Sequence, residues 1–261
     1  MNHLFSEDKG VGTPVVMLHG FPFHQKLWAS FAALLSKHFR VVTPDLPGFG
    51  KSPALPAGFS IDDVAERLSG WLVEKNLRNC VLIGHSLGGY VALSAVKNDP
   101  SLFAGFGLFH STSYADSPEK KESREKVIEF IDKNGVQAFT GNFINTLFAD
   151  RQHPSIPYVK SLALEASAET VKGYTLAMRD RSERTDVLES FAKPILFLAG
   201  KKDAGISVDS VHKQASVCAY PEVHILTQAA HMGMFENELK CAEIIQKFVE
   251  KATVTSPGES V

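Results

Sequence analysis

The stretch Cys80-Val81-Leu82-Ile83-Gly84-His85-Ser86-Leu87-Gly88 decides the fold of this 261-residue chain. Its first four residues form an apolar run that is typical of a buried strand, and residues 90–98 have the pattern of a helix. A strand, Gly-x-Ser-x-Gly and a helix in this order are typical of a nucleophile elbow, a tight turn that holds a serine in unfavourable backbone angles. Gly84 and Gly88 are small where strand and helix nearly touch. The motif therefore predicts that Ser86 is a catalytic nucleophile.

The composition is that of an ordinary globular protein, with 44% hydrophobic and 21% charged residues. The formal net charge of −2 argues against a nucleic-acid-binding surface or a polybasic membrane patch. No apolar run approaches the roughly 20 residues needed to cross a bilayer, and residues 1–8 lack the pattern of a signal peptide. The cysteines Cys80, Cys218 and Cys241 are odd in number and widely spaced, which indicates buried thiols in a reducing compartment. We therefore expect a cytoplasmic protein without a nucleic-acid or membrane partner, while the oligomeric state stays unknown.

Short apolar runs alternate with longer amphipathic stretches along the chain. This alternation predicts an α/β fold with a mostly parallel sheet covered by helices on both faces. Ser60 is expected to cap a helix over 61–74, with Asp63 at its third position. The expected strands are 15–18, 40–43, 80–83, 104–109, 195–199 and 223–226, and further helices are expected at 28–37 and 90–98.

Between about Ser111 and Phe191 the sequence shows no convincing strand. Four stretches there look helical: 120–133, 136–148, 158–168 and 170–179. Such a block of helices between two core strands predicts an inserted cap. We expect a hydrolase-type core at 1–110 and 192–252, an all-helical cap at 111–191 and a flexible tail at 253–261.

A serine needs a base that takes its proton, and after an elbow the partners are expected in the order acid, then histidine. His231 follows the predicted strand 223–226, and Asp203 follows the strand 195–199, where ligands bind in open α/β sheets. We predict His231 as the general base and then acid, and Asp203 as the carboxylate that orients the imidazole. Asp116, near the end of the strand 104–109, is the alternative acid; otherwise it is a turn or cap residue.

The oxyanion hole needs two backbone N–H groups, one after the nucleophile and one from an early loop. The loop His19-Gly20-Phe21-Pro22 follows the first clear strand, so the amides of Leu87 and Phe21 are the expected donors. Pro22 has no N–H and cannot donate. Glu236 is expected to favour the N-terminus of the last helix through its dipole. The candidate pocket residues are Phe23, His24, His110 and Phe143.

With these motifs in order, the chain resembles the α/β-hydrolase superfamily over residues 14–249, and within it the small capped esterase, lactonase and perhydrolase group. The resemblance rests on 19–22 with Trp28, on 45–52, on 84–89, on 200–203 and on His231 with Glu236. The cap stretches 115–119 and 178–188 also look similar, although more weakly. One departure is the short region before Val15, where the family usually has two antiparallel strands and this chain has room for about one. The first sheet strand of the family is therefore expected to be missing.

The resemblance implies a serine hydrolase that needs no cofactor or metal and cleaves a small to medium, largely apolar ester or lactone. Ser86 separates the chain from relatives that have an aspartate at the elbow, such as epoxide hydrolases and haloalkane dehalogenases. Two alternatives stay open. The same triad could hydrolyse a C–C bond or carry out perhydrolysis, or the chain could be a small-molecule receptor or signalling partner with slow turnover.

Overall fold

A computed structural model of the chain describes residues 3–254. Its centre is a seven-stranded sheet with the order β1-β3-β2-β4-β5-β6-β7, in which β1 pairs antiparallel with β3 and the other neighbours are parallel. This confirms the predicted fold class, and within 3–254 a single strand, β1, precedes β2. The strands are β1 (Ser6–Lys9), β2 (Pro14–Leu18), β3 (Arg40–Pro44), β4 (Cys80–His85), β5 (Phe103–Phe109), β6 (Ile195–Gly200) and β7 (Pro221–Leu226).

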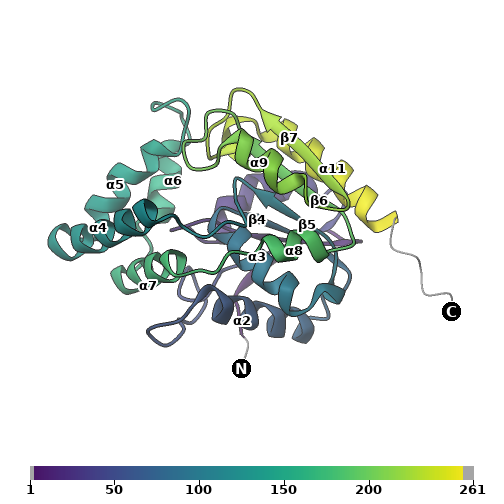
Figure 1. Cartoon of the computed structure of the whole chain (residues 1–261), viewed down its shortest axis with the longest axis horizontal. Coiled ribbons are helices and arrows are strands. Elements are labelled where there is room, and N and C mark those ends of the chain that lie inside the picture. Colours follow the sequence, from purple (N-terminus) through teal and green to yellow (C-terminus); the bar gives the residue numbers. More distant parts are fainter. Residues whose placement is uncertain (1–2, 255–261) are drawn as a thin grey trace.

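Alternate residues of the central strands enter two separate hydrophobic cores, because successive side chains of a strand point to opposite faces. Val16 and Leu18 of β2 pack in one core, and Val15 and Met17 pack in the other. The first core contains residues from α2 (Ile61–Glu74), α3 (Leu87–Asn98), α8 (Thr185–Ser190) and α9 (Val208–Ala215). The second contains residues from α1 (Ala29–Leu35) and α11 (Glu238–Val254). The sheet is thus covered on both faces (Figure 1).

Local sequence signals explain several element ends. Ser60 and Asp63 form a capping box at the start of α2, as predicted. The single helix expected over 28–37 is instead a short 3-10 helix, η1 (Gln25–Trp28), followed by α1, and a second 3-10 helix, η2 (Pro100–Leu102), precedes β5. The predicted tail begins too early, since Thr253 and Val254 are the last residues of α11. The rest of it, 255–261, lies outside the described residues.

Five helices separate β5 from β6: α4 (Pro118–Asn134), α5 (Val136–Thr146), α6 (Ile156–Ala163), α7 (Ala168–Arg179) and α8. Figure 1 shows α4 to α7 gathered on the left, beyond the end of the sheet, and we refer to these four as the cap helices. No pattern in the sequence predicted α8, which contacts α3 and α9 over the sheet. The domain boundaries at 110/111 and 191/192 stay a prediction.

The cap helix α7 is hydrogen-bonded to the loop that follows β3. The hydroxyl of Tyr174 donates to the carbonyl of Pro47 (2.9 Å), and that of Thr170 donates to the carbonyl of Gly48 (3.1 Å). Because Tyr174 is fully buried, this contact is shielded from water. The cap therefore has a fixed point of attachment near the loop 19–22, which we call the oxyanion loop.

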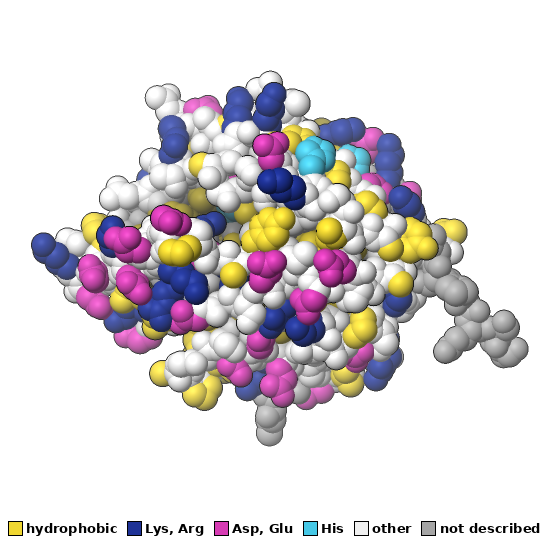
Figure 2. Space-filling view, viewed as in Figure 1, with side chains coloured by type: hydrophobic (Ala, Val, Ile, Leu, Met, Phe, Trp, Pro, Cys, Tyr) yellow, Lys and Arg dark blue, Asp and Glu magenta, His cyan; other side chains and the backbone are white. Residues whose placement is uncertain are grey.

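Acidic and basic side chains are mixed over the face seen in Figure 2, including the cap helices on the left. Within residues 3–254, no helix has the length and apolar character that crossing a membrane requires. The expected cytoplasmic location stays a prediction.

Candidate active site

Ser86 lies at the sharp turn between β4 and α3, with a φ of 52° and a ψ of −114°. Such a backbone is costly for a non-glycine residue and persists only where the surroundings enforce it. A Cβ on Gly84 would lie 2.3 Å from the carbonyl oxygen of Gly88, and one on Gly88 would lie 2.6 Å from that of Leu18. Both glycines are therefore required by close backbone contact. Ser86 is partly exposed between buried neighbours, as a reacting serine must be.

The loop 19–22 lies directly against this turn. A Cβ on Gly20 would be 2.4 Å from His85 Nδ1 and 3.3 Å from Ser86 Cβ. His19 fixes the loop, because its Nε2 accepts the N–H of Leu46 (2.9 Å) and its Nδ1–H donates to the carbonyl of Gly20 (3.0 Å). Burial lowers the pKa of His19 to about 3, so the ring stays neutral.

The two expected oxyanion donors flank Ser86. Leu87 is the first residue of α3, and an N–H in the first turn of a helix has no acceptor within the helix. Phe21 follows Gly20 in the loop that contacts Ser86. Within residues 3–254 its amide donates to no other protein group. Both N–H groups are thus available near the serine.

Asp203 and His231 meet at the ends of β6 and β7. The Nδ1 of His231 lies 2.7 Å from Oδ2 of Asp203, and the two side chains are 15% and 2% exposed. The other oxygen, Oδ1, accepts the N–H groups of Gly205 (2.8 Å) and Ile206 (3.2 Å). Burial alone would raise the pKa of Asp203, but the charge of His231 and the hydrogen bonds from His110 and His231 lower it far more. The carboxylate is therefore ionised and holds the imidazole by Nδ1.

Ser86 and His231 are joined through His85 rather than directly. His85 Nε2–H donates to the carbonyl of His231 (2.9 Å), and their ring centroids are 5.1 Å apart. Within the described residues, no hydrogen bond links Ser86 Oγ to His231. In unliganded enzymes such hydrogen bonds are often long and tighten when substrate binds. Burial, with the charges of His231 and His110, lowers the pKa of His85 well below its ordinary value, so this brace stays neutral.

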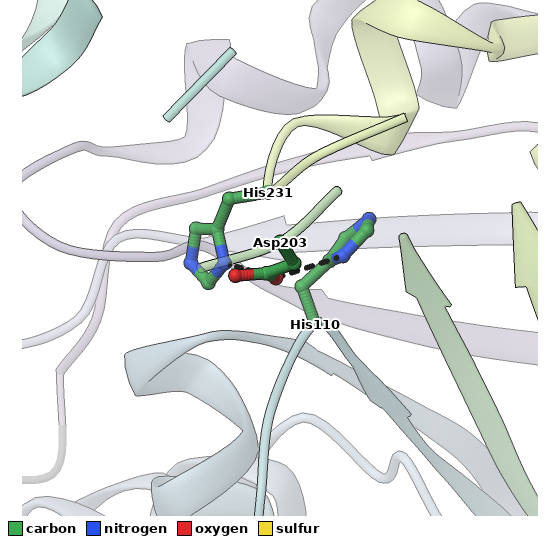
Figure 3. Close-up of side chains that lie close together, drawn as sticks. All are labelled: His110, Asp203 and His231. Atoms are coloured by element: carbon green, nitrogen blue, oxygen red, sulfur yellow. Dashed lines mark hydrogen bonds and ion pairs between the residues drawn. The ribbon is translucent and has the colours of Figure 1, made fainter. Parts of the chain in front are cut away.

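His110 lies behind Asp203, not in the pocket where the sequence placed it. Figure 3 shows the carboxylate of Asp203 between the rings of His110 and His231. His110 is fully buried, with Nδ1 3.3 Å from Asp203 Oδ2 and Nε2 3.2 Å from the amide nitrogen of Gly233. The same Nδ1 also lies 3.2 Å from the amide nitrogen of Gly200, so it faces both a carboxylate, which only accepts, and an amide, which only donates. Burial lowers the pKa of His110, so the ring stays neutral.

His110, Asp203 and His231 are also residue types that bind metals, with ligand atoms within 4.8 Å of one another. Both rings approach the same oxygen, Oδ2, at hydrogen-bond distances. The contact of Asp203 with His231 is a hydrogen bond, and Nδ1 of His110 also accepts the N–H of Gly200. The absence of a metal requirement stays a prediction.

The other candidate pocket residues have different surroundings. Phe23 is fully buried in the core of α1 and α11, and His24 is buried with its Nε2 3.4 Å from a carboxylate oxygen of Glu165. Phe143, on α5, is half-buried, and its ring centroid lies 6.4 Å from that of Phe21. Of these, Phe143 has the position expected of a residue beside the oxyanion loop.

Asp116, the alternative acid, is bound to arginines at the base of the cap. Its carboxylate forms ion pairs with Arg124 and, at 2.7 Å, with Arg181. Arg181 in turn stacks on the ring of Tyr90 and donates to the carbonyls of Met178 and Tyr114. Asp203, not Asp116, is therefore the carboxylate that contacts His231.

Glu236 has contacts that the sequence did not predict. It is the last residue of the short helix α10 (Gly233–Glu236), just before α11, and its carboxylate accepts the backbone N–H groups of Ala149, Ala230 and Met232. No local signal identified this role, because Ala149 is distant in sequence.

Comparisons with known proteins agree with this geometry. A family model described as the alpha/beta hydrolase family matches residues 15–244. The AB hydrolase superfamily protein YisY of Bacillus subtilis is 25% identical over 257 residues, which cover 94% of each chain. The structure of a thermophilic esterase from Thermogutta terrifontis is 31% identical, with a TM-score of 0.89 over 95% of this chain and 93% of that one. An esterase from Exiguobacterium antarcticum shares the fold, with 23% identity and a TM-score of 0.88 over 95% of each chain. The chain belongs to the alpha/beta hydrolase family.

Proposed function

We propose that this protein is a serine esterase that hydrolyses small to medium, largely apolar carboxylic esters or lactones. The observation that carries the proposal is the 2.7 Å contact between His231 Nδ1 and Asp203 beside the elbow that holds Ser86. The contact fixes the tautomer that leaves Nε2 of His231 free to accept a proton. The similarity to the Thermogutta terrifontis esterase over almost the whole chain supports the same class of reaction.

In the acylation step, Ser86 Oγ attacks the carbonyl carbon while His231 Nε2 takes the hydroxyl proton. The amides of Phe21 and Leu87 stabilise the oxyanion that develops on the carbonyl oxygen. His231 then donates its proton to the leaving alcohol oxygen, and the acyl group remains on Ser86. Asp203 stays ionised and stabilises the imidazolium, because its carboxylate already accepts two backbone N–H groups.

Water completes the cycle in the second half of the reaction. His231 removes a proton from a water molecule, which attacks the acyl carbon and forms a second oxyanion at the same two amides. The acid leaves when Ser86 Oγ regains its proton from His231. No step requires a redox change.

Aromatic side chains above the oxyanion loop support an apolar substrate. Phe139 and Phe143 of α5 stack on each other, with centroids 5.2 Å apart, and each lies 6.4 Å from the ring of Phe21. Phe49 approaches Phe21 from the core side at 6.5 Å. A carbonyl held by the Phe21 amide would therefore place its acyl or alcohol group beside these rings.

The decisive test is hydrolysis of p-nitrophenyl acetate and butyrate by the Ser86→Ala variant. We expect kcat to fall by at least about 10⁴-fold, since the nucleophile acts as a unit with its base. Ser216→Ala is the matched control, because that exposed hydroxyl only donates to the carbonyl of Lys213 at the end of α9. A fluorophosphonate probe should label Ser86 in the wild type and nothing in Ser86→Ala.

Turnover by Ser86→Ala at the wild-type rate would overturn the proposal. Negligible turnover by the wild type on a broad ester panel, together with ligand-dependent stabilisation, would favour the receptor alternative. Assays of the wild type and Ser86→Ala with peroxide and with diketones decide between ester hydrolysis, perhydrolysis and C–C bond hydrolysis.

A further inference from the structure

The loop that carries His231, residues 227–232, is called the histidine loop below. One carboxylate fixes it on both sides of His231. Oε2 of Glu236 accepts the N–H of Ala230 (2.9 Å) and the N–H of Met232 (3.3 Å). The carbonyl of His231 accepts from His85 between these two contacts. The backbone around His231 is thus held by side chains that do not touch its ring nitrogens.

The second oxygen of the same carboxylate reaches the cap. Oε1 of Glu236 accepts the N–H of Ala149 at 2.7 Å. In the same segment the carbonyl of Leu147 accepts the N–H of His231 at 2.9 Å. Residues 147–149 are therefore hydrogen-bonded to the histidine loop at two points, once directly and once through Glu236.

This segment directly continues α5. Leu147 is the C-cap residue of that helix, which carries the two phenylalanines beside Phe21. Leu147 and Phe148 are buried, so the segment is packed as well as bonded. One continuous piece of chain thus joins the aromatic side of the oxyanion loop to His231.

We propose that Glu236 is a positioning residue that couples the placement of α5 to the placement of His231. A substrate group that moves the aromatic rings of α5 would then move the histidine loop with them. The catalytic consequence rests on the proposed function, whereas the mechanical link does not. The two oxygens of a carboxylate both accept, so Glu236 can serve all three N–H groups at once.

The test variant is Glu236→Gln, which keeps the size of the side chain but has one acceptor oxygen. Its NH2 group must face an N–H donor, either Ala149 or the histidine loop. We expect kcat for p-nitrophenyl butyrate to fall about ten- to hundredfold with KM changed less than about threefold, because a small displacement of the base affects the reaction and not binding. Glu243→Gln is the control, since that exposed carboxylate pairs only with Lys240 and Lys247 on α11.

Titration with a fluorophosphonate separates positioning from partial unfolding. In Glu236→Gln the labelled fraction at completion should equal that of the wild type, while the rate of labelling should fall in parallel with kcat. A reduced labelled fraction with a normal rate per labelled site would mean that Glu236 only stabilises the fold, and would overturn the proposal. Should Glu236→Gln fail to fold, Glu236→Asp serves in its place, because the shorter side chain keeps the charge but cannot span both partners.

Hydrogen–deuterium exchange tests the link without any assay of activity. Amides in both 147–149 and 230–232 should exchange faster in Glu236→Gln, and neither segment should change in Glu243→Gln. Faster exchange confined to 230–232 would contradict a link to the cap. If Ser86→Ala proves active, the proposed function fails, yet this exchange experiment still decides whether Glu236 joins the two segments.

Discussion

The loops of the core and the helices of the cap are held in different ways. Each core loop near Ser86 is fixed by a buried polar side chain: His19 holds the oxyanion loop, His85 holds the histidine loop and His110 holds Asp203. The cap is attached to the core by hydrogen bonds from α6, from α7 and from residues 147–149.

The start of helix α5 has few local restraints. It begins after Gly135 without a side-chain cap and contains Gly141, where an added Cβ would meet nothing within 4 Å. Tightly held core loops suit a reaction that needs fixed geometry, and a helix whose start is less restrained suits the choice of substrate. We therefore expect core variants to change kcat and cap variants to change selectivity.

Among the variants that compare core and cap, Asp203→Asn in the core should have the largest effect. We expect kcat to fall about 10³- to 10⁴-fold, because an amide in place of the carboxylate favours the wrong tautomer of His231. The measurement is kcat for p-nitrophenyl acetate, with the folded state checked by circular dichroism.

Asp116→Asn is the matched variant in the cap. It should leave kcat within about threefold but lower the free energy of unfolding by about 3 kcal/mol, since Arg124 and Arg181 lose their buried partner. A larger loss of kcat in Asp116→Asn than in Asp203→Asn would reverse the comparison.

Acid should weaken the core before it weakens the base of the cap. The pKa values of His19, His85 and His110 are all lowered by burial, so below the unfolded pKa of about 6.5 the unfolded chain binds protons that the folded chain does not. As the pH is lowered below about 6.5, the free energy of unfolding should then fall by up to about 1.4 kcal/mol per pH unit for each histidine. At the base of the cap, burial raises the pKa of Asp116, but Arg124 and Arg181 lower it by more than burial raises it. The ion pairs of Asp116 with these arginines should therefore persist.

Urea unfolding at about pH 7 and about pH 5.5 measures this fall. His110→Asn should reduce it, because one of the three groups is removed. His212→Gln, at an exposed position on α9, should leave it unchanged. A free energy of unfolding that stays constant over this range would show that the three rings do not resist protonation.

The smallest effect should come from Phe143→Ala in the cap. Removal of this ring opens space beside Phe21, so the ratio of kcat/KM for p-nitrophenyl octanoate to that for the acetate should rise about tenfold. Phe130→Ala on α4, where the ring is 39% exposed, should leave the ratio unchanged. An equal change in both variants would place the selectivity outside α5.

Local patterns explain what was predictable. The capping box at Ser60, the helix α2 and the central strands depend on residues close together in the chain, and they were found within a few residues of their true ends. Helix α8 was missed because its six residues are too few to show a clear period. His110 was misplaced because it directly follows β5, whose end lies between β4, which leads to the elbow, and β6, which leads to Asp203.

The sequence by itself determined the elbow at Ser86 and the order of Asp203 and His231 along the chain, because a strand, tight turn and helix are local geometry. It also determined that the parallel strands carry their loops to one edge of the sheet. Only the tertiary structure decided that Asp203 and not Asp116 contacts His231, that His110 lies behind Asp203, and that Glu236 joins the histidine loop to Ala149. These contacts join residues that are far apart in the sequence. They form through the packing of the cap and the sheet, which no local pattern reveals.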